Sequence, residues 1–169
     1  MIKNTTKWVL PIITALLTLF LVISSFMPHR KTLIVVTRET TATKKQIWKQ
    51  WADVPNRKNW DTSMEYATID GPFQTGSTGE VKLSGQPLSK YEIIYCKELE
   101  AYTDRFSLPL FAKMDFIHMI KPSDKGNEVT FKVELRGPFI FVYAGMIEKT
   151  LKAELPLAVD KLISLAEAD

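Results

Sequence analysis

Apolar residues recur at intervals of three and four positions across residues 137–169, the longest such pattern in the chain. This spacing predicts one long helix with a single apolar face, which must pack against another element. Gly137 and Pro138 provide its start, since proline fits the first helical turn, where its missing N–H costs nothing. Pro156 lies in the middle, where it removes a backbone hydrogen bond and clashes with the preceding turn. We therefore expect a kink or a short break between two helical halves.

Short strands separated by turn residues precede this helix. The predicted strands cover residues 31–40, 64–70, 80–85, 90–98, 102–108, 112–122 and 127–137. In the last strand, charged residues on a wet face alternate with apolar residues on the other face, namely Val129, Phe131, Val133 and Leu135. In the strand before it, the same alternation leaves Lys113, Asp115 and Lys121 outward and points inward Met114, Phe116, His118 and Ile120.

Between the first two predicted strands, the period changes to that of a helix. Ile47 and Trp51 have helical spacing, and Thr43 is suited to the N-cap. Pro55 ends that helix, and residues 57–61 form a turn or a second short helix. One strand, two helices and then only strands excludes repeated βαβ units, so the sheet should be antiparallel. The expected fold class is α+β, with a curved antiparallel sheet of about six or seven strands wrapped round the C-terminal helix.

Residues 8–27 form an uncharged, mostly apolar run whose length suits a helix that crosses the hydrocarbon core of a membrane. Cationic residues flank it, as at the ends of many membrane spans: Lys3, Lys7, His29, Arg30 and Lys31. We therefore expect a transmembrane helix, with residues 1–30 as tail and anchor and residues 31–169 as one folded domain. A cleaved secretory signal peptide is the alternative, although no Ala-x-Ala pattern follows the run. We expect a single-pass membrane protein with an extracytoplasmic domain.

Composition narrows the possible partners. A length of 169 residues suits one domain with a short extra segment. The formal net charge is only +3 and the charges are interleaved, so no surface for nucleic acid is expected. Cys96 is the only cysteine, which excludes an internal disulfide and a zinc site built on several thiolates. We predict no metal and no cofactor.

Three segments carry a family resemblance. Residues 47–61 read IWKQWADVPNRKNWD, residues 70–83 read DGPFQTGSTGEVKL, and residues 129–139 (VTFKVELRGPF) run into a helix that ends LPLAVDKLISLAEA. In this order they resemble the entry helices, the glycine-rich loop and the C-terminus of the polyketide cyclase/dehydrase and START-like (SRPBCC) superfamily, whose fold is the helix-grip. The resemblance covers Leu33 to Glu167. The N-terminal membrane segment is a departure, since most soluble members lack one.

The resemblance implies a cavity between the sheet and the long helix for an apolar ligand, such as a lipid, a sterol, a polyketide or an aromatic metabolite. It does not imply one reaction, so function has to be argued from the site. We expect a membrane-anchored domain that binds a hydrophobic small molecule or lipid without catalysis. The residues expected to line the cavity are Met114, Phe116, His118, Ile120, Phe131, Val133, Tyr143, Ile147 and Leu151.

An enzyme and a ligand-free protein-interaction module are the alternatives. A cyclase, dehydratase or hydrolase would use His118 as general acid or base, with Asp104 or Tyr102 as its polar partner. A histidine that is hydrogen-bonded at the edge of the sheet is the simpler interpretation of His118. Because Asp104 and Arg105 are neighbours, one of them must face inward in a regular strand, as a polar anchor for a ligand. A solvated edge or a surface ion pair is the simpler interpretation of those two.

Other features also have a structural and a functional interpretation. Cys96 is expected to be a small buried hydrophobe. The glycines of residues 71–79 permit a hairpin, or allow a gate over the cavity. Residues 138–147 are apolar nearly all round, so they are either wrapped by the sheet or face the bilayer. The tryptophans of the entry segment pack its helices or form a stacking surface at a pocket mouth: Trp48, Trp51 and Trp60.

Overall fold

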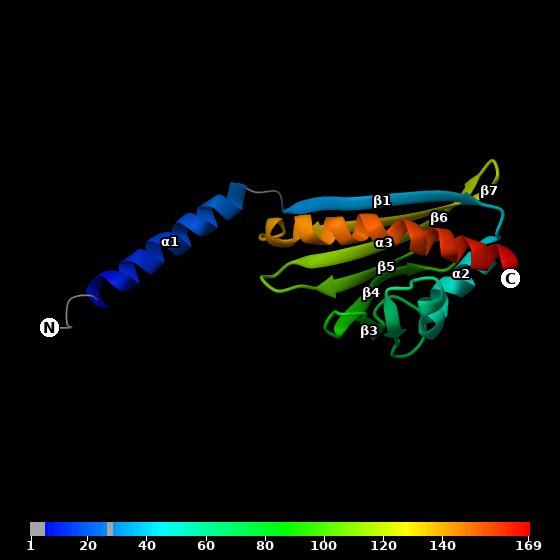
Figure 1. The fold of residues 1–169 in the computed structure, drawn as a ribbon, viewed down its shortest axis with the longest axis horizontal. Coiled ribbons are helices and arrows are strands. Elements are labelled where there is room, and N and C mark those ends of the chain that lie inside the picture. Colours follow the sequence, from blue (N-terminus) through cyan, green and yellow to red (C-terminus); the bar gives the residue numbers. More distant parts are fainter. Residues whose placement is uncertain (1–5, 27–28) are drawn as a thin grey trace.

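The computed structural model describes residues 6–26 and 29–169. It contains one antiparallel sheet that curves round a long helix, α3 (Phe141–Ala168), while α1 (Thr6–Phe26) extends from one end of the domain (Figure 1). The strands are β1 (Arg30–Thr40), β2 (Met64–Ala67), β3 (Thr78–Leu83), β4 (Ser89–Lys97), β5 (Ala101–Ser107), β6 (Lys113–Ser123) and β7 (Gly126–Arg136). The predicted α+β class is confirmed.

The seven strands have the order β1-β7-β6-β5-β4-β3-β2, and every neighbouring pair is antiparallel. Strands β2 to β7 form successive hairpins, and β1 pairs with β7, so the first and last strands of the chain lie side by side. The predicted hairpin of β2 and β3 is present. This arrangement places the concave face of the sheet against α3 and leaves the convex face toward solvent.

The two short helices predicted after the first strand are both present. In α2 (Lys44–Ala52), the side chain of Thr43 accepts a hydrogen bond from the N–H of Gln46, and the Gln46 side chain accepts one from the N–H of Thr43. This reciprocal capping box satisfies two backbone donors that a helix start leaves free. A 3-10 helix, η1 (Val54–Asn59), follows directly, with Pro55 in its first turn.

The helix α3 is continuous, so the short break that was one expectation at Pro156 is wrong, while the kink that was the other stays a prediction. Leu155 and Val159, on either side of the proline, are buried, and this tertiary packing holds the helix through the missing backbone hydrogen bond. The helix also begins at Phe141, later than predicted. Gly137 has a φ of +122°, which is outside the helical region, and turns the chain from β7 toward the helix.

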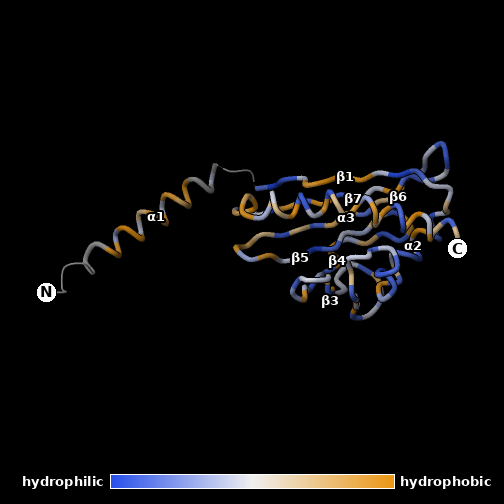
Figure 2. The backbone as a smooth tube through the Cα atoms, in the orientation of Figure 1, coloured by the Kyte–Doolittle hydropathy of each residue, from blue (hydrophilic) through white to orange (hydrophobic). Residues whose placement is uncertain are grey.

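The helix α1 occupies the predicted position, and hydrophobic residues run along much of it (Figure 2). Its side chains from Val9 to Val22 are exposed. No helix in residues 6–26 or 29–169 is both long and apolar enough to qualify as a membrane span. The transmembrane helix predicted for residues 8–27 is therefore not supported, and Met27 lies outside the described residues. A stacked ring pair connects α1 to the domain, with the centroids of Phe20 and Phe139 5.0 Å apart.

The convex face of the sheet is charged, but two of its carboxylates are buried rather than solvated. Asp115 accepts two hydrogen bonds from Arg105, both of 2.7 Å, and Glu134 accepts two from Arg30, of 2.9 and 3.0 Å. Arg136 contacts both carboxylates. Alternation along the strand assigned Asp115 and Glu134 correctly to the outer face. It could not predict that cross-strand arginines would cover them.

Candidate functional site

Aromatic side chains fill the interior at the end of the sheet that α2 and η1 cover. Trp51 of α2 is fully buried, and its ring meets Tyr102 of β5 and Phe131 of β7 edge-on, with centroids 5.2 and 5.9 Å apart. Phe73, from the loop between β2 and β3, packs on Tyr102 at 4.9 Å and on Trp48 at 5.6 Å. The predicted packing role of these tryptophans is confirmed. The glycine-rich loop does more than turn the chain, because its phenyl ring helps to close this end.

A buried ion pair lies among these rings. Arg57 in η1 donates from Nη1 to Oδ2 of Asp104 in β5 at 3.2 Å, and from Nε to the backbone oxygen of Trp51 at 3.0 Å. The guanidinium carbon lies 5.1 Å from the ring centroid of Tyr102, within the range of a cation–π contact. Burial raises the pKa of Asp104, and the charge and hydrogen bond of Arg57 only partly offset that rise.

His118 lies in the middle of the sheet, since β6 is flanked by β5 and β7, so its interpretation as an edge residue is wrong. The register places it opposite Tyr102, and the two rings stack with centroids 4.1 Å apart. Phe131 meets the imidazole edge-on at 4.4 Å. Burial, and then the charge of Arg57, lower the pKa of His118 well below its ordinary value, so the imidazole is neutral at physiological pH.

Five buried side chains each have a polar atom with no hydrogen-bond partner among the described residues. These atoms are Trp51 Nε1, Arg57 Nη2, Tyr102 Oη, Asp104 Oδ1 and His118 Nδ1. We call these five residues the polar cluster; each is more than nine-tenths buried. An unsatisfied buried polar group costs about 1–3 kcal/mol, so five together require an explanation. Because the cluster offers both donors and acceptors, it is suited to hold ordered water or the polar group of a ligand.

The three candidate catalytic residues lie close together, but the contacts of Asp104 are made to Arg57. The carboxylate of Asp104 binds Arg57, and within the described part of the chain no hydrogen bond joins it to His118. Burial also raises the pKa of the Tyr102 hydroxyl well above its usual range, so this group stays protonated. In the described ranges, no three His, Cys, Asp or Glu side chains are grouped so that they could hold a metal ion.

The face of α3 that packs on the sheet is covered unevenly along its length. In the C-terminal half, the large apolar side chains of Leu155 and Leu162 are buried. Ile147 and Leu151 continue the same spacing toward the N-terminus, yet both are only partly buried. The sheet therefore covers the second half of this helix more completely than the first.

The eight apolar residues predicted to line a cavity all belong to the apolar cluster between sheet and helix. Three are buried (Ile120, Phe131 and Val133) and five are partly buried (Met114, Phe116, Tyr143, Ile147 and Leu151). The ninth, His118, contacts this group through Phe131. Asp104 lies opposite Phe116 in the register of β5 and β6, so the partly covered apolar surface adjoins the polar cluster. That these residues bind a ligand remains a prediction.

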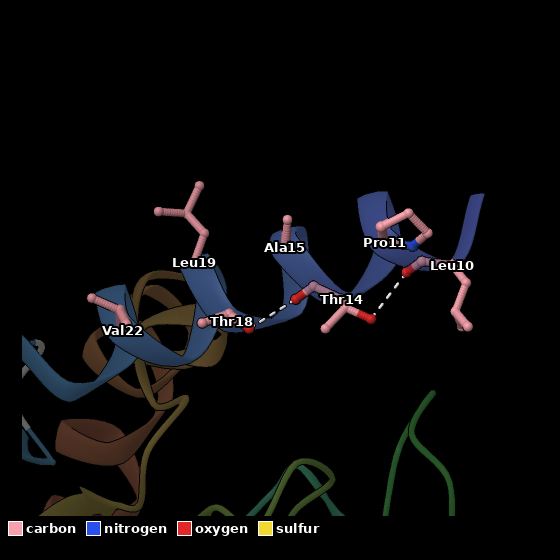
Figure 3. A pocket seen from close by; sticks show the side chains of 7 residues that line it. All are labelled: Leu10, Pro11, Thr14, Ala15, Thr18, Leu19 and Val22. Carbon is pink, nitrogen blue, oxygen red and sulfur yellow. Dashed lines mark hydrogen bonds between the residues drawn. The ribbon is translucent and has the colours of Figure 1, made fainter. Parts of the chain in front are cut away.

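The described part of the chain has two surface hollows away from the polar cluster. One, of about 780 Å³, is lined by α1 alone, and in it Thr14 and Thr18 donate their hydroxyl protons to the carbonyl oxygens of Leu10 and Thr14 (Figure 3). This hollow is an open helix surface. The other, of about 340 Å³, is a mostly polar recess where α2 and η1 meet the C-terminal turn of α3. Neither lies between the sheet and α3, where the cavity was expected.

Sequence reasoning found His118, Asp104 and Tyr102 but missed Arg57. Of the neighbours Asp104 and Arg105, it is Asp104 that faces inward, while Arg105 binds Asp115 on the convex face. The sequence did offer a signal for Arg57, since it lies between Trp51 and Trp60 in a segment expected to be buried. A buried arginine needs a carboxylate partner, which here is Asp104. Cys96 is less buried than expected, and burial raises the pKa of its thiol.

No protein-family model and no curated protein matches this sequence. Solved structures match over most of it. Ara h 8.0201 is 12% identical, with a TM-score of 0.65 over 83% of this chain and 99% of that one. Protein MLL2253 from Mesorhizobium loti is 16% identical, with a TM-score of 0.60 over 82% and 98%. The di-domain ARO/CYC StfQ from the steffimycin biosynthetic pathway is 6% identical, with a TM-score of 0.67 over 80% of this chain and 50% of that protein.

Identities this low carry information about the fold alone. Each match leaves out a fifth of this chain or less. The curved antiparallel sheet, the two short helices after the first strand and the long closing helix are the elements that the sequence predicted and on which the resemblance to the SRPBCC superfamily rested. The chain therefore has the helix-grip fold of SRPBCC proteins.

Proposed function

We propose that this chain binds a hydrophobic small molecule or lipid between the sheet and the N-terminal half of α3, and that α1 attaches it to a membrane. The proposed ligand binding rests on the uneven burial of α3, whose N-terminal half is less covered by the sheet than its C-terminal half. Large apolar side chains that are left partly exposed on an inward-facing surface favour occupation by an apolar partner. Ile147 and Leu151 on the helix and Met114 and Phe116 on the sheet form this surface.

The polar cluster supports a ligand with one polar end. Because Asp104 lies opposite Phe116, an apolar body on the partly covered surface brings a terminal hydroxyl or carboxyl group toward the five unsatisfied atoms. Such a group would replace water as their hydrogen-bond partner. The ligand class is therefore an amphiphile, with a long apolar part and one compact polar group.

The attachment to a membrane rests on the exposure of α1. Its apolar side chains from Val9 to Val22 are exposed, which favours lipid as their surroundings. Flotation of the full chain with phosphatidylcholine vesicles tests this part. An enzyme fusion whose activity depends on the compartment, placed after Asp169, tests the proposed extracytoplasmic side.

A cyclase-like or dehydratase-like enzyme is the second candidate. The convergence of His118, Tyr102 and Asp104 supports it, and so does StfQ, a protein of this fold that is named as an ARO/CYC of a biosynthetic pathway. A substrate must then displace the rings that cover His118. Turnover that disappears in His118→Phe, in a variant that still binds ligand, would favour the enzyme.

Photo-crosslinking tests the proposed binding surface. A fatty acid that carries a diazirine is irradiated with the full chain in detergent, and the adducts are mapped by peptide mass spectrometry. We expect adducts on residues 113–117 and 143–151, and competition by the unlabelled fatty acid. Ile147→Trp should reduce these adducts by filling the surface, whereas Leu157→Trp, at an exposed position of the same helix, should not. Adducts confined to α1 would contradict the proposed site.

A further inference from the structure

Exposed apolar side chains gather at the end of the domain from which α1 departs. In the turn between β5 and β6, 83% of Phe111 is exposed, and Leu110 beside it is exposed as well. The first turns of α3 add Phe141, Val142 and Met146, of which Met146 is 70% exposed. Figure 2 shows hydrophobic segments gathered at this end. We call these five residues the apolar end.

The two segments of the apolar end are adjacent in space. Gly137 lies so close to the β5–β6 turn that a Cβ atom on it would be 2.7 Å from the backbone oxygen of Phe111. Leu110 and Phe111 both have positive φ angles, of +55° and +60°, which non-glycine residues rarely adopt. The turn therefore accepts an unfavourable backbone conformation while it holds two large apolar side chains in solvent. Strain of this kind is typical of functional positions.

The apolar surface continues onto α1. Phe20 of α1 stacks on Phe139, which lies two residues before the start of α3. The N–H of Gly137 also donates to the carbonyl oxygen of His29, so the chain leaving α1 passes beside the apolar end. Both apolar surfaces are therefore on one side of the molecule, and a partner that covers one of them lies next to the other.

Cations lie beside the apolar end, and the carboxylate partners of Arg30 and Arg136 are buried. Arg30, Arg136 and Lys113 occupy matching register positions on β1, β7 and β6. The side chain of Arg30 is 58% exposed, whereas that of its partner Glu134 is 1% exposed. Lys31 is likewise more exposed than its partner Glu148. The charge that this end presents to a partner is therefore mainly positive, although the ion pairs are nearly balanced.

We propose that the apolar end docks on the surface of a bilayer that contains anionic lipid. Its apolar side chains enter the boundary between headgroups and acyl chains, and the neighbouring cations contact the lipid phosphates. This deepens the membrane attachment proposed above and rests on it. Docking in this pose places the partly covered half of the interior, at Ile147 and Leu151, next to the lipid from which an apolar ligand would enter.

Site-specific fluorescence tests the pose in the full chain. Cys96→Ser removes the natural thiol, and Phe111→Cys or Met146→Cys carries a nitrobenzoxadiazole fluorophore. Lys125→Cys, in the exposed β6–β7 turn at the opposite end of the sheet, is the matched control. The probe is a vesicle of phosphatidylcholine and phosphatidylglycerol, with phosphatidylcholine alone for comparison.

We expect the labels at 111 and 146 to shift to the blue and brighten several-fold on anionic vesicles, and to be quenched by lipids with a nitroxide on the acyl chain. The label at 125 should change little. The response should weaken without anionic lipid and in high salt, because both remove the attraction of the cations.

Three results would overturn the docking proposal. Unchanged labels at 111 and 146 on vesicles that carry the protein would leave α1 as the attachment and remove the docking surface. An equal response at 125 would show that the end is not specific. A shift that occurs without vesicles and grows with protein concentration would assign the surface to a second copy of the chain. Failure of the full chain to float would instead remove the membrane attachment itself.

Discussion

The imidazole of His118 lies flat on the phenol ring of Tyr102, with the ring planes 3° from parallel and the centroids 4.1 Å apart. Neighbouring antiparallel strands bring the two residues opposite each other. Arg57 reaches the same place from η1 and makes a cation–π contact with Tyr102. The polar cluster therefore depends on contacts between segments that are far apart in sequence.

The lowered pKa of His118 makes the stability of the protein depend on pH. The pKa of His118 in the folded state is below its unfolded value of about 6.5. The neutral imidazole therefore contributes fully to the unfolding free energy above about pH 6.5, and this contribution is lost as the pH falls below that value. The loss approaches ~1.4 kcal/mol per pH unit. Urea unfolding at a series of pH values should show this slope in the wild type and in His29→Gln. His118→Phe should lack it. Parallel curves for His118→Phe and the wild type would contradict a buried neutral imidazole.

Removal of Arg57 should leave Asp104 as a buried carboxylate without a counter-charge. We expect Arg57→Ala to lose about 3–5 kcal/mol of unfolding free energy at neutral pH. Lower pH should restore part of this stability. Burial raises the pKa of Asp104, so the carboxyl group takes up a proton in the folded state and no longer carries a buried charge. The double variant Arg57→Met/Asp104→Leu should be more stable than Arg57→Ala, because no buried charge remains. Equal stability of the single and double variants in urea would argue against the ion pair.

Gly137 is required by the backbone next to the apolar end. Its φ of +122° and the 2.7 Å approach to the oxygen of Phe111 leave no room for a methyl group. Gly137→Ala should therefore cost about 1–3 kcal/mol. Gly145→Ala is the matched control, since a Cβ there meets open space in a helix and should stabilise the protein by up to about 1 kcal/mol. Thermal unfolding of both variants checks that stability falls in Gly137→Ala and rises in Gly145→Ala. Unchanged stability of Gly137→Ala would show that the turn has another conformation.

Pro156 lies within a continuous helix, where alanine would restore the missing N–H. Pro156→Ala should raise the unfolding free energy by about 1–3 kcal/mol. Leu157→Ala, at the exposed neighbouring position, controls for the loss of a side chain. A destabilised Pro156→Ala in urea would indicate that the helix needs the local geometry that proline imposes.

Much of the fold could be predicted, because it depends on local signals. The Thr43 cap, the alternation in β6 and β7 and the glycines between β2 and β3 each act over a few residues. Pro156 wrongly favoured a break as one of two outcomes, since the loss of one hydrogen bond is a local cost, whereas the burial of Leu155 and Val159 depends on the sheet.

The site was predicted less completely, because its contacts are not local. Alternation could place His118 inward and could state that Asp104 or Arg105 faces inward. It could not choose between them, since the choice depends on Arg57, which lies 47 positions from Asp104. The degree to which α3 is covered depends in the same way on the curvature of the whole sheet.

Native mass spectrometry of the full chain, extracted in a mild detergent, tests the central claim most directly. The account predicts that the wild type and Leu157→Trp retain an amphiphilic molecule after detergent is removed in the gas phase, while Ile147→Trp retains much less of it. That difference separates a ligand beneath α3 from lipid that adheres to α1. Detection of only the mass of the polypeptide, also after addition of excess fatty acid, would contradict the claim that the helix-grip interior binds a ligand.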